Sequence, residues 1–219
     1  MAFKSKVLAV RVLGRCGGTI ADIADAVTWA SGGVVAGVPL VGANKATVIN
    51  MSLGGGGSCA GSVMQAAITG ALGRRTTVVV AAGNNNANVA GFTPASCTGA
   101  GLIVVGATDA AAKKAGFSNF GAGVDVSAPG VSIASTYNTG TTVPVADAYA
   151  YLSGTSMSSP HVAGLAAMMQ SKPAVDCAPA QIEILIKTWI KPFGVPAPLP
   201  GTMGTGIINA FTAVQNAPC

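Results

Sequence analysis

Five short segments of the chain are almost continuously apolar and rich in valine and isoleucine. Strands of a parallel sheet have this composition, because helices bury both of their faces. Longer segments between them carry apolar residues at helical spacing, for example Ile23, Val27 and Ala30. The alternation predicts βαβ units, and therefore an α/β fold in which helices cover both faces of a mostly parallel sheet. The predicted strands are residues 6–13, 46–52, 76–82, 102–107 and 124–127, and the predicted helices are residues 20–30, 62–72 and 179–190, with two more after Ser156 and near Asn209.

Length and composition favour one domain. The chain has 219 residues, of which 50% are apolar, and this suffices for a single sizeable core. No repeat, linker or low-complexity segment divides the sequence, so residues 1–219 are predicted to form one domain. Charged residues make up only 9% of the chain, against roughly 25% in ordinary globular proteins. The polarity of the surface therefore depends mainly on serine, threonine and asparagine.

Neither a nucleic acid nor a membrane is predicted as a partner. The net charge is +5, but lysine and arginine are scattered and form no patch with aromatic residues. The most membrane-like uncharged segment, residues 26–44, contains several glycines and Pro39, which argue against a spanning helix. Near the N-terminus, Arg11 interrupts the apolar residues 7–10 too early for a signal peptide, so this segment is assigned to the first strand.

The clearest chemical signal is a hydroxyl at the start of a predicted helix. Ser156 lies among small residues, and Pro160 suits the first turn of the helix that follows. The unpaired N–H groups and the positive end of the helix dipole favour the negative charge that develops when a hydroxyl attacks a carbonyl. Ser156 is therefore a candidate nucleophile for acyl transfer. Residues 154–164, Gly-Thr-Ser-Met-Ser-Ser-Pro-His-Val-Ala-Gly, resemble the active-serine motif of the subtilisin-like serine proteases, or subtilases.

Two loops that follow predicted strands also resemble subtilase motifs, at the edge of a parallel sheet where ligands collect. Residues 52–57 follow the second strand and residues 81–84 follow the third. The resemblance implies that Asn84 completes the oxyanion hole, and that backbone groups on both sides hold an extended polypeptide substrate. It also implies a pocket for an apolar substrate side chain, with its base near residues 91–92. The substrate-binding residues implied in this way are Ser52, Leu53, Gly54, Ala82, Gly83, Gly17, Gly18 and Thr19.

Each loop also has a simpler interpretation. Residues 54–57 could form a flexible turn or a phosphate loop, although the Gly-Lys-Ser/Thr that a phosphate loop requires does not follow. Asn84 could be an ordinary turn residue. The motifs occur in subtilase order, however, together with Ala-Pro-Gly at residues 128–130 and a segment at residues 204–210 that resembles the end of the catalytic domain. The resemblance covers nearly the whole chain and implies a subtilisin-like three-layer fold.

The resemblance does not supply a general base or its orienting acid. A serine nucleophile needs a base within hydrogen-bond reach, and subtilases carry these groups in the order Asp, His, Ser. The one histidine of the chain, His161, follows Ser156 by five residues and therefore lies about 140° around the helix axis. This placement favours a packing or capping role. Asp22, Asp25 and Asp125 do not occupy the position of the family's aspartate.

The sequence therefore resembles the C-terminal portion of a subtilase catalytic domain whose N-terminal part, with the aspartate and histidine segments, is missing. In the family fold the aspartate-bearing strand lies beside the strand that matches residues 46–52, so its loss would leave an unpaired edge and an aggregation-prone chain. We expect a serine endopeptidase by family that is nearly inactive alone. The alternative is a non-catalytic peptide-binding or complementing fragment. A nucleotide-binding Rossmann-like domain is disfavoured, because no Gly-x-Gly-x-x-Gly follows the first strand.

The cysteines and the family resemblance indicate a secreted protein. The five cysteines include no C-x-x-C pair, and with one histidine a zinc site is not expected. Disulfides Cys16–Cys59 and Cys177–Cys219 are predicted, because each pair lies in loops that the expected fold brings together; five reduced core thiols are the alternative. The expected partners are a polypeptide substrate and either the missing N-terminal segment or a propeptide. No cofactor is expected apart from the structural calcium that family members often bind, and no run of carboxylates here forms such a site by itself.

Overall fold

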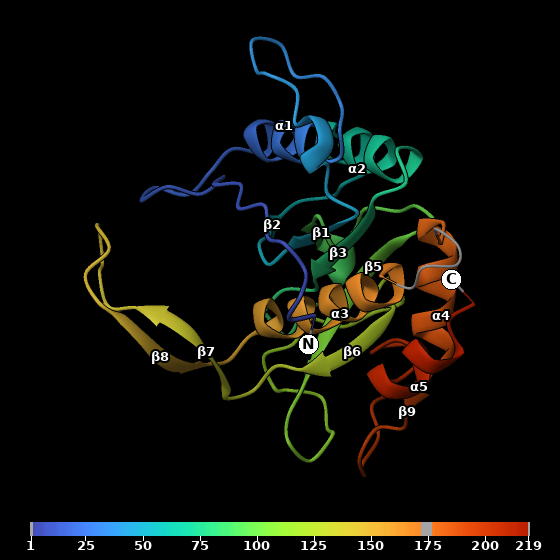
Figure 1. Cartoon of the computed structure of the whole chain (residues 1–219). Helices are drawn as coiled ribbons and strands as arrows, with labels where there is room; N and C mark the ends of the chain where they lie inside the picture. Colours follow the sequence, from blue (N-terminus) through green and yellow to red (C-terminus); the bar gives the residue numbers. More distant parts are fainter. Residues whose placement is uncertain (1, 172–176, 219) are drawn as a thin grey trace.

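The computed structural model describes residues 2–171 and 177–218. Within these residues the main sheet has the strand order β1-β3-β5-β6-β10-β9, with β1 at one edge (Figure 1). Neighbouring strands are parallel from β1 to β10, and β9 is antiparallel to β10. The carboxyl ends of the parallel strands therefore lie at one edge of the sheet. The strands are β1 (Val48–Met51), β3 (Thr77–Ala81), β5 (Leu102–Thr108), β6 (Val126–Pro129), β9 (Ile190–Lys191) and β10 (Ile207–Ile208).

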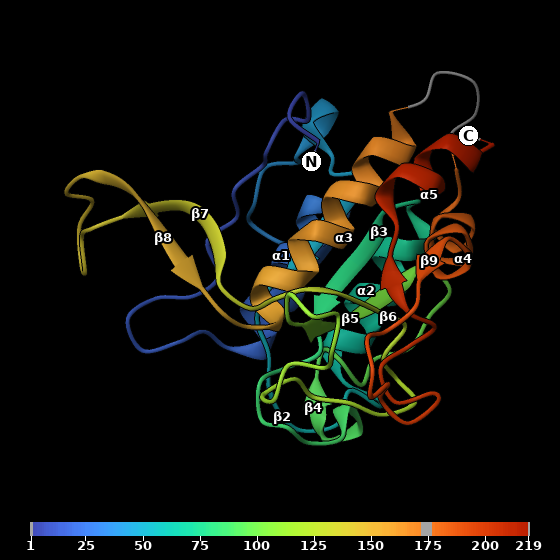
Figure 2. The same ribbon diagram turned by 90° about the horizontal axis from the view of Figure 1, so that it is seen from below.

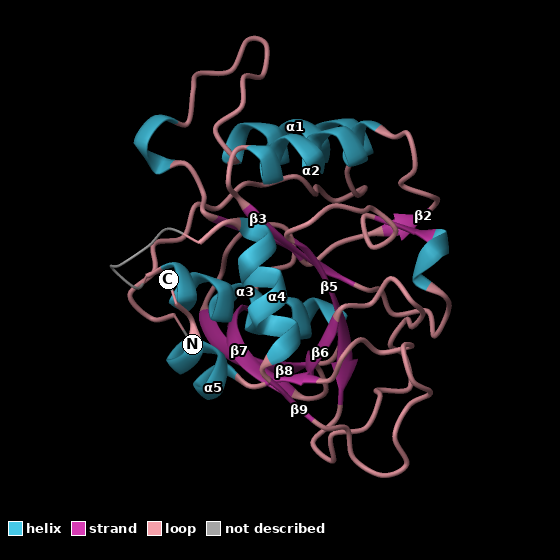
Figure 3. Ribbon diagram, turned by 90° about the vertical axis from the view of Figure 1, so that its right-hand side faces the viewer, coloured by secondary structure: helices cyan, strands magenta, loops and turns pink. Residues whose placement is uncertain are grey.

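Helices cover both faces of this sheet (Figures 1 and 3). Val78 and Val80 of β3 pack into a core with the first two helices, whereas Val79 packs into a second core with the last three. Successive side chains of a strand point to opposite faces, so one valine-rich strand serves both cores. This is the predicted α/β architecture of three layers. The helices are α1 (Ile20–Ala30) and α2 (Val63–Gly73) on one face, and α3 (Thr155–Gln170), α4 (Pro179–Thr188) and α5 (Ala210–Asn216) on the other.

The helices begin in two different ways. The hydroxyl of Thr19 accepts a hydrogen bond from the backbone N–H of Asp22 at the start of α1, and the hydroxyl of Ser62 does the same for Gln65 at the start of α2. Such caps satisfy N–H groups that a helix leaves unpaired. In contrast, α3 begins after Gly154 without a side-chain cap. Across the described part of the chain, no helix is both long and apolar enough to cross a membrane.

Two small antiparallel sheets flank the main one. β2 (Gly55–Gly56) pairs with β4 (Phe92–Thr93), which joins the loop after β1 to the segment after β3. β7 (Ile133–Asn138) and β8 (Asp147–Leu152) form a hairpin that projects from the body of the protein (Figures 1 and 2). Short 3₁₀ helices lie at Gly42–Asn44 and Val89–Gly91. The β2–β4 pair lies beside the predicted site.

Most predicted elements are present, but the predicted strand at residues 6–13 is wrong. Residues 46–52 and 76–82 contain β1 and β3, residues 102–107 contain all but the last residue of β5, and residues 124–127 contain part of β6. A helix lies at each predicted position. Residues 6–13 have no regular secondary structure and join no sheet, and apart from Val12 they are exposed. Apolar composition favours a strand only where a neighbouring strand accepts its backbone hydrogen bonds, and this segment has no such neighbour in the described structure.

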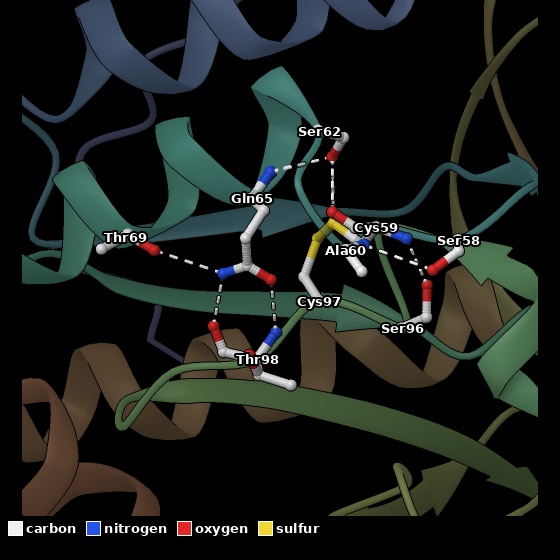
Figure 4. Close-up of a disulfide and its surroundings, with 9 residues drawn as sticks. All are labelled: Ser58, Cys59, Ala60, Ser62, Gln65, Thr69, Ser96, Cys97 and Thr98. Atoms are coloured by element: carbon white, nitrogen blue, oxygen red, sulfur yellow. Dashed lines mark hydrogen bonds between the residues drawn. A yellow bond between two sulfur atoms is a disulfide. The ribbon is translucent and has the colours of Figure 1, made fainter.

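The predicted pairing of Cys16 with Cys59 is also wrong. Cys59 forms a disulfide with Cys97, with a Cα–Cα distance of 4.9 Å (Figure 4). The β2–β4 pairing brings these two residues together, since one follows β2 and the other follows β4. Cys16 is an exposed free thiol in the turn at residues 14–17. Cys177 is disulfide-bonded, as predicted, whereas its predicted partner Cys219 lies outside the described residues.

Candidate functional site

The predicted nucleophile, Ser156, lies in the first turn of α3, directly against the end of β1. Its hydroxyl donates a hydrogen bond to the backbone oxygen of Ser52 at 3.2 Å. In return, the hydroxyl of Ser52 donates to the backbone oxygen of Ser156 at 2.8 Å. Asn50 of β1 extends this contact, because it accepts from the hydroxyl of Ser159 and donates to the hydroxyl of Ser52. The first turn of α3 is therefore joined to the carboxyl end of β1.

Pro160 explains why the backbone oxygen of Ser156 needs a side-chain donor. The structure places Pro160 inside α3, beyond the first turn where the sequence prediction put it, because α3 begins at Thr155. An ordinary residue at this position would donate its N–H to the backbone oxygen of Ser156, and proline has no N–H to donate. The hydroxyl of Ser52 takes its place. Because of the proline, the backbone oxygen of Ser156 is free to accept from Ser52, and this hydrogen bond joins α3 to the residue that follows β1.

The predicted oxyanion donor, Asn84, is oriented by the residue that precedes Ser156. The side-chain oxygen of Asn84 accepts from the backbone N–H of Thr155 at 2.8 Å and from the Thr155 hydroxyl at 3.0 Å. A backbone N–H can only donate, so the atom that faces it must be the amide oxygen. The NH₂ end of the Asn84 side chain is therefore left to donate elsewhere. Thr155 is fully buried, which keeps this orientation stable.

Gly83 brings the loop after β3 close to its neighbours. Its backbone has a φ of +103°, and a Cβ at this position would lie 2.3 Å from the side-chain nitrogen of Asn119. A side chain is therefore excluded on both conformational and steric grounds. The backbone N–H of Gly83 donates to the Thr155 hydroxyl at 3.0 Å, so Thr155 holds the backbone before Asn84 as well as its side chain.

A pocket of about 420 Å³ opens beside Ser156 and Asn84, which is within the usual range for small-ligand sites. One wall comes from the loop after β1 and another from the loop after β3, as predicted. Of residues 91–92, where the floor of the pocket was expected, Phe92 is part of the lining, and so is its neighbour Thr93. Ser52 is not part of the lining, although it touches Ser156. The lining residues that the sequence predicted are Leu53, Gly54, Ala82, Gly83 and Phe92.

Residues 17–19, also predicted to bind substrate, are not among the residues that line this pocket. Gly17 closes a turn with Gly14, and Thr19 caps α1. All three are exposed, and Gly18 lies close against the backbone of Val12. Their part in binding an extended substrate beyond the pocket stays a prediction.

The chain's own histidine and the partly buried carboxylate of Asp125 bind other groups. Nδ1 of His161 lies 2.8 Å from the backbone oxygen of Met157, one turn back in the same helix. Asp125 pairs with Lys187 at 2.8 Å and accepts from the backbone N–H of Val104. Burial raises the pKa of the Asp125 carboxyl, and the hydrogen bond from Lys187 opposes the rise. Neither group lines the pocket beside Ser156.

A metal site is also not evident. Among residues 2–171 and 177–218, no group of three or more histidine, cysteine, aspartate or glutamate side chains could hold a metal ion. Calcium sites also use backbone and amide oxygens, so a structural calcium ion stays a prediction from the family resemblance.

Comparison with known proteins assigns the chain to a family. The sequence profile described as the Subtilase family matches residues 1–201. The chain belongs to the subtilase family. The family predicted from residues 154–164 and the two loops is confirmed, and so is the subtilisin-like fold.

Individual subtilases resemble the chain along nearly its whole length. The Extracellular protease of Xanthomonas campestris pv. campestris is 55% identical over 216 residues, which are 99% of this chain and 36% of that protein. Subtilisin Savinase of Lederbergia lenta is 35% identical over 216 residues, which are 98% of this chain and 70% of that protein. A solved protease structure from Pseudoalteromonas arctica superimposes with a TM-score of 0.91 at 45% identity, covering 99% of this chain and 64% of that one. The subtilase chain thus spans about a third of the first protein.

Sequence reasoning on this subtilase missed two residues that organise the site. Thr155 orients the side chain of Asn84. Its position directly before Ser156 could have indicated from the sequence that it belongs to the site. Asn119 contacts the loop that contains Asn84. It belongs to none of the recognised sequence motifs, so only the structure reveals it.

Proposed function

We propose that this chain provides the nucleophile and the oxyanion donor of a serine endopeptidase. Ser156 Oγ attacks the carbonyl carbon of the scissile peptide bond and loses its proton to a base, while the Asn84 NH₂ group donates to the oxyanion that forms. One observation carries the proposal: Thr155 binds the amide oxygen of Asn84, which leaves the NH₂ group as the donor, and Asn84 and Ser156 line the same pocket of about 420 Å³.

The substrate that fits this site is an extended polypeptide. The loops after β1 and β3 offer backbone groups on two sides, which suits pairing with an extended chain. The pocket between them is lined by Leu53, Ala82, Phe92 and Ala95, together with glycine, asparagine, threonine and Ser156. These four apolar side chains favour an apolar side chain next to the scissile bond. We also propose that the protein is secreted, since two relatives are named extracellular proteases and a disulfide is present.

The base and its orienting carboxylate come from a second segment in this proposal, because His161 is the one histidine of the chain and contacts its own helix. The chain alone should therefore hydrolyse peptides very slowly. In subtilisin itself, removal of the histidine lowers kcat by about 10⁶. The second segment would donate an imidazole that takes the proton of Ser156 and passes it to the leaving amine.

The open edge of β1 is the proposed place for this segment. β1 pairs with β3 on one side, and beyond its other side lies a cleft of about 1110 Å³ between residues 2–8, α1, β1 and the end of α3. A parallel strand added there would lie about 4.8 Å from β1 and end at the same edge of the sheet. The loop after it would therefore reach Ser156, which already touches the residue that follows β1. The match covers 64% of the solved relative, and the remainder of that chain is long enough to provide such a strand.

The test combines this chain with a separately produced polypeptide that covers the unmatched part of the solved relative. Hydrolysis of a chromogenic peptide should be near background for either piece alone and should rise at least 10³-fold for the mixture, on the order expected for restoring a base. Ser156→Ala should abolish the gain. If the mixture binds peptide without cleaving it, the chain is a non-catalytic binding module and not part of a protease. Activity that survives Ser156→Ala would refute the proposal.

A further inference from the structure

Asn119 forms hydrogen bonds to the backbone of the loop that contains Asn84, and it does not contact the Asn84 side chain. It lies between β5 and β6 and is fully buried. Its side-chain nitrogen donates to the backbone oxygen of Ala82 at 2.9 Å, before Asn84. Its side-chain oxygen accepts from the backbone N–H groups of Asn85 at 2.9 Å and Ala87 at 3.0 Å, after Asn84. The loop is therefore held from one side chain on both flanks of the predicted oxyanion donor.

The backbone of Asn119 adds a fourth contact. Its N–H donates to the backbone oxygen of Gly83 at 2.9 Å, and its side-chain nitrogen fills the space that a Cβ on Gly83 would need. The conformation of Gly83 at a φ of +103° and the position of Asn119 therefore depend on each other. Because Asn84 follows Gly83 directly, a shift of this backbone would move the Asn84 side chain.

Two neighbours restrain Asn84 in different ways. Thr155 binds the amide oxygen of the side chain and sets its rotation. Asn119 binds the backbone on either side and sets the position from which that side chain extends. An oxyanion donor must lie within a few tenths of an ångström of where the charge develops, and a misplacement of 1 Å can cost about 10²-fold in rate. Both restraints are therefore needed.

Only an amide side chain satisfies all three partners. The Asn119 oxygen accepts twice and the nitrogen donates once. Aspartate would keep the acceptors but would place a charged oxygen against the backbone oxygen of Ala82, and alanine would remove the acceptor of two partly buried N–H groups. The residue type thus matches the loop it holds.

We propose that Asn119 is a positioning residue for the oxyanion donor of the proposed protease, a role that rests on the proposed function of Asn84 and Ser156. It acts through the backbone of residues 82–87 and does not touch the substrate. Its loss should lower kcat and leave KM nearly unchanged, because the oxyanion forms only after the substrate is bound. The upper limit is the loss of the donor itself, about 10²–10³-fold in a related subtilisin.

The experiment is a double-mutant cycle in the two-part complex of this chain and the second segment. Asn119→Ala should lower kcat by about 10- to 100-fold in the presence of Asn84. In the Asn84→Ala background the same change should lower kcat by less than about 2-fold, since the donor it positions is gone. Ser127→Ala is the matched control. It also removes a buried hydrogen bond to the backbone, which the Ser127 hydroxyl donates to the backbone oxygen of Met203 away from the pocket. This change should leave kcat unchanged.

A merely structural role predicts a different pattern. Equal losses from Asn119→Ala with and without Asn84 would overturn the proposal, as would a loss matched by Ser127→Ala. A second readout does not depend on hydrolysis: the side-chain NH₂ resonances of Asn84, assigned through Asn84→Asp, should shift or broaden in Asn119→Ala and stay in place in Ser127→Ala. If the mixture never hydrolyses peptide, the proposed protease function is refuted. Independently of that result, Asn84 resonances that do not change in Asn119→Ala would refute the positioning role of Asn119.

Discussion

The contact between Ser52 and the backbone of Ser156 leads to a quantitative prediction. Pro160 cannot donate to the backbone oxygen of Ser156, and the Ser52 hydroxyl donates to it at 2.8 Å. Ser52→Ala removes this donor and leaves a partly buried carbonyl unpaired. The net loss of such a hydrogen bond is about 1 kcal/mol, and an unpaired carbonyl raises it toward about 2 kcal/mol. In a domain of this size that corresponds to a fall in Tm of roughly 2–8 °C.

The decisive measurement repeats Ser52→Ala in a Pro160→Ala background. Pro160 is exposed, so its replacement opens no cavity in the core. The new N–H at position 160 can bond to the backbone oxygen of Ser156, and Ser52→Ala should then cost less than about 0.5 kcal/mol. The coupling energy between the two changes should therefore be about 1 kcal/mol, within the range of residues that share a partner.

Urea unfolding followed by tryptophan fluorescence measures these free energies, in the chain alone or in the two-part complex, whichever unfolds cooperatively. Ser58→Ala is the control, since its hydroxyl accepts only an exposed hydrogen bond from Ala60, and it should change the free energy of unfolding by less than about 0.5 kcal/mol. An equal cost of Ser52→Ala in both backgrounds would refute the idea that Ser52 substitutes for the missing N–H of Pro160.

Two further predictions concern charge and covalent structure. Burial raises the pKa of Asp125, so the folded state keeps the proton of this carboxyl to higher pH than the unfolded state does, and the resulting stabilisation is lost as pH rises through the folded pKa. The free energy of unfolding, measured relative to Asp125→Asn, should therefore increase on acidification toward pH 4. A difference between the two proteins that does not change with pH would contradict the assignment. The Cys59–Cys97 disulfide closes a loop of 38 residues, so the double variant Cys59→Ala, Cys97→Ala should lower the free energy of unfolding by roughly 3–4 kcal/mol. Urea unfolding measures this difference. Cys16→Ser is the control and should leave the free energy of unfolding unchanged.

Local pattern in the sequence determined much of this protein. Helical spacing placed α1 at its observed bounds, and continuous valine runs located β3 and β5, because the side-chain periodicity of an element depends on the residues within it. The motif at residues 154–164 identified the family. It also placed Ser156 at the start of a helix, since small residues before a helical run are a local signal.

Tertiary structure decided everything that depends on a distant partner. Residues 6–13 have the composition of a strand, but they pair with no strand among the residues that the structure describes. Cys59 bonds to Cys97 because the β2–β4 pairing brings the two together. The orientation of Asn84 by Thr155 and the grip of Asn119 on the loop at residues 82–87 join segments more than thirty residues apart. Hydrogen bonds between such segments leave no periodicity in the sequence, because each depends on where the folded backbone carries the two groups.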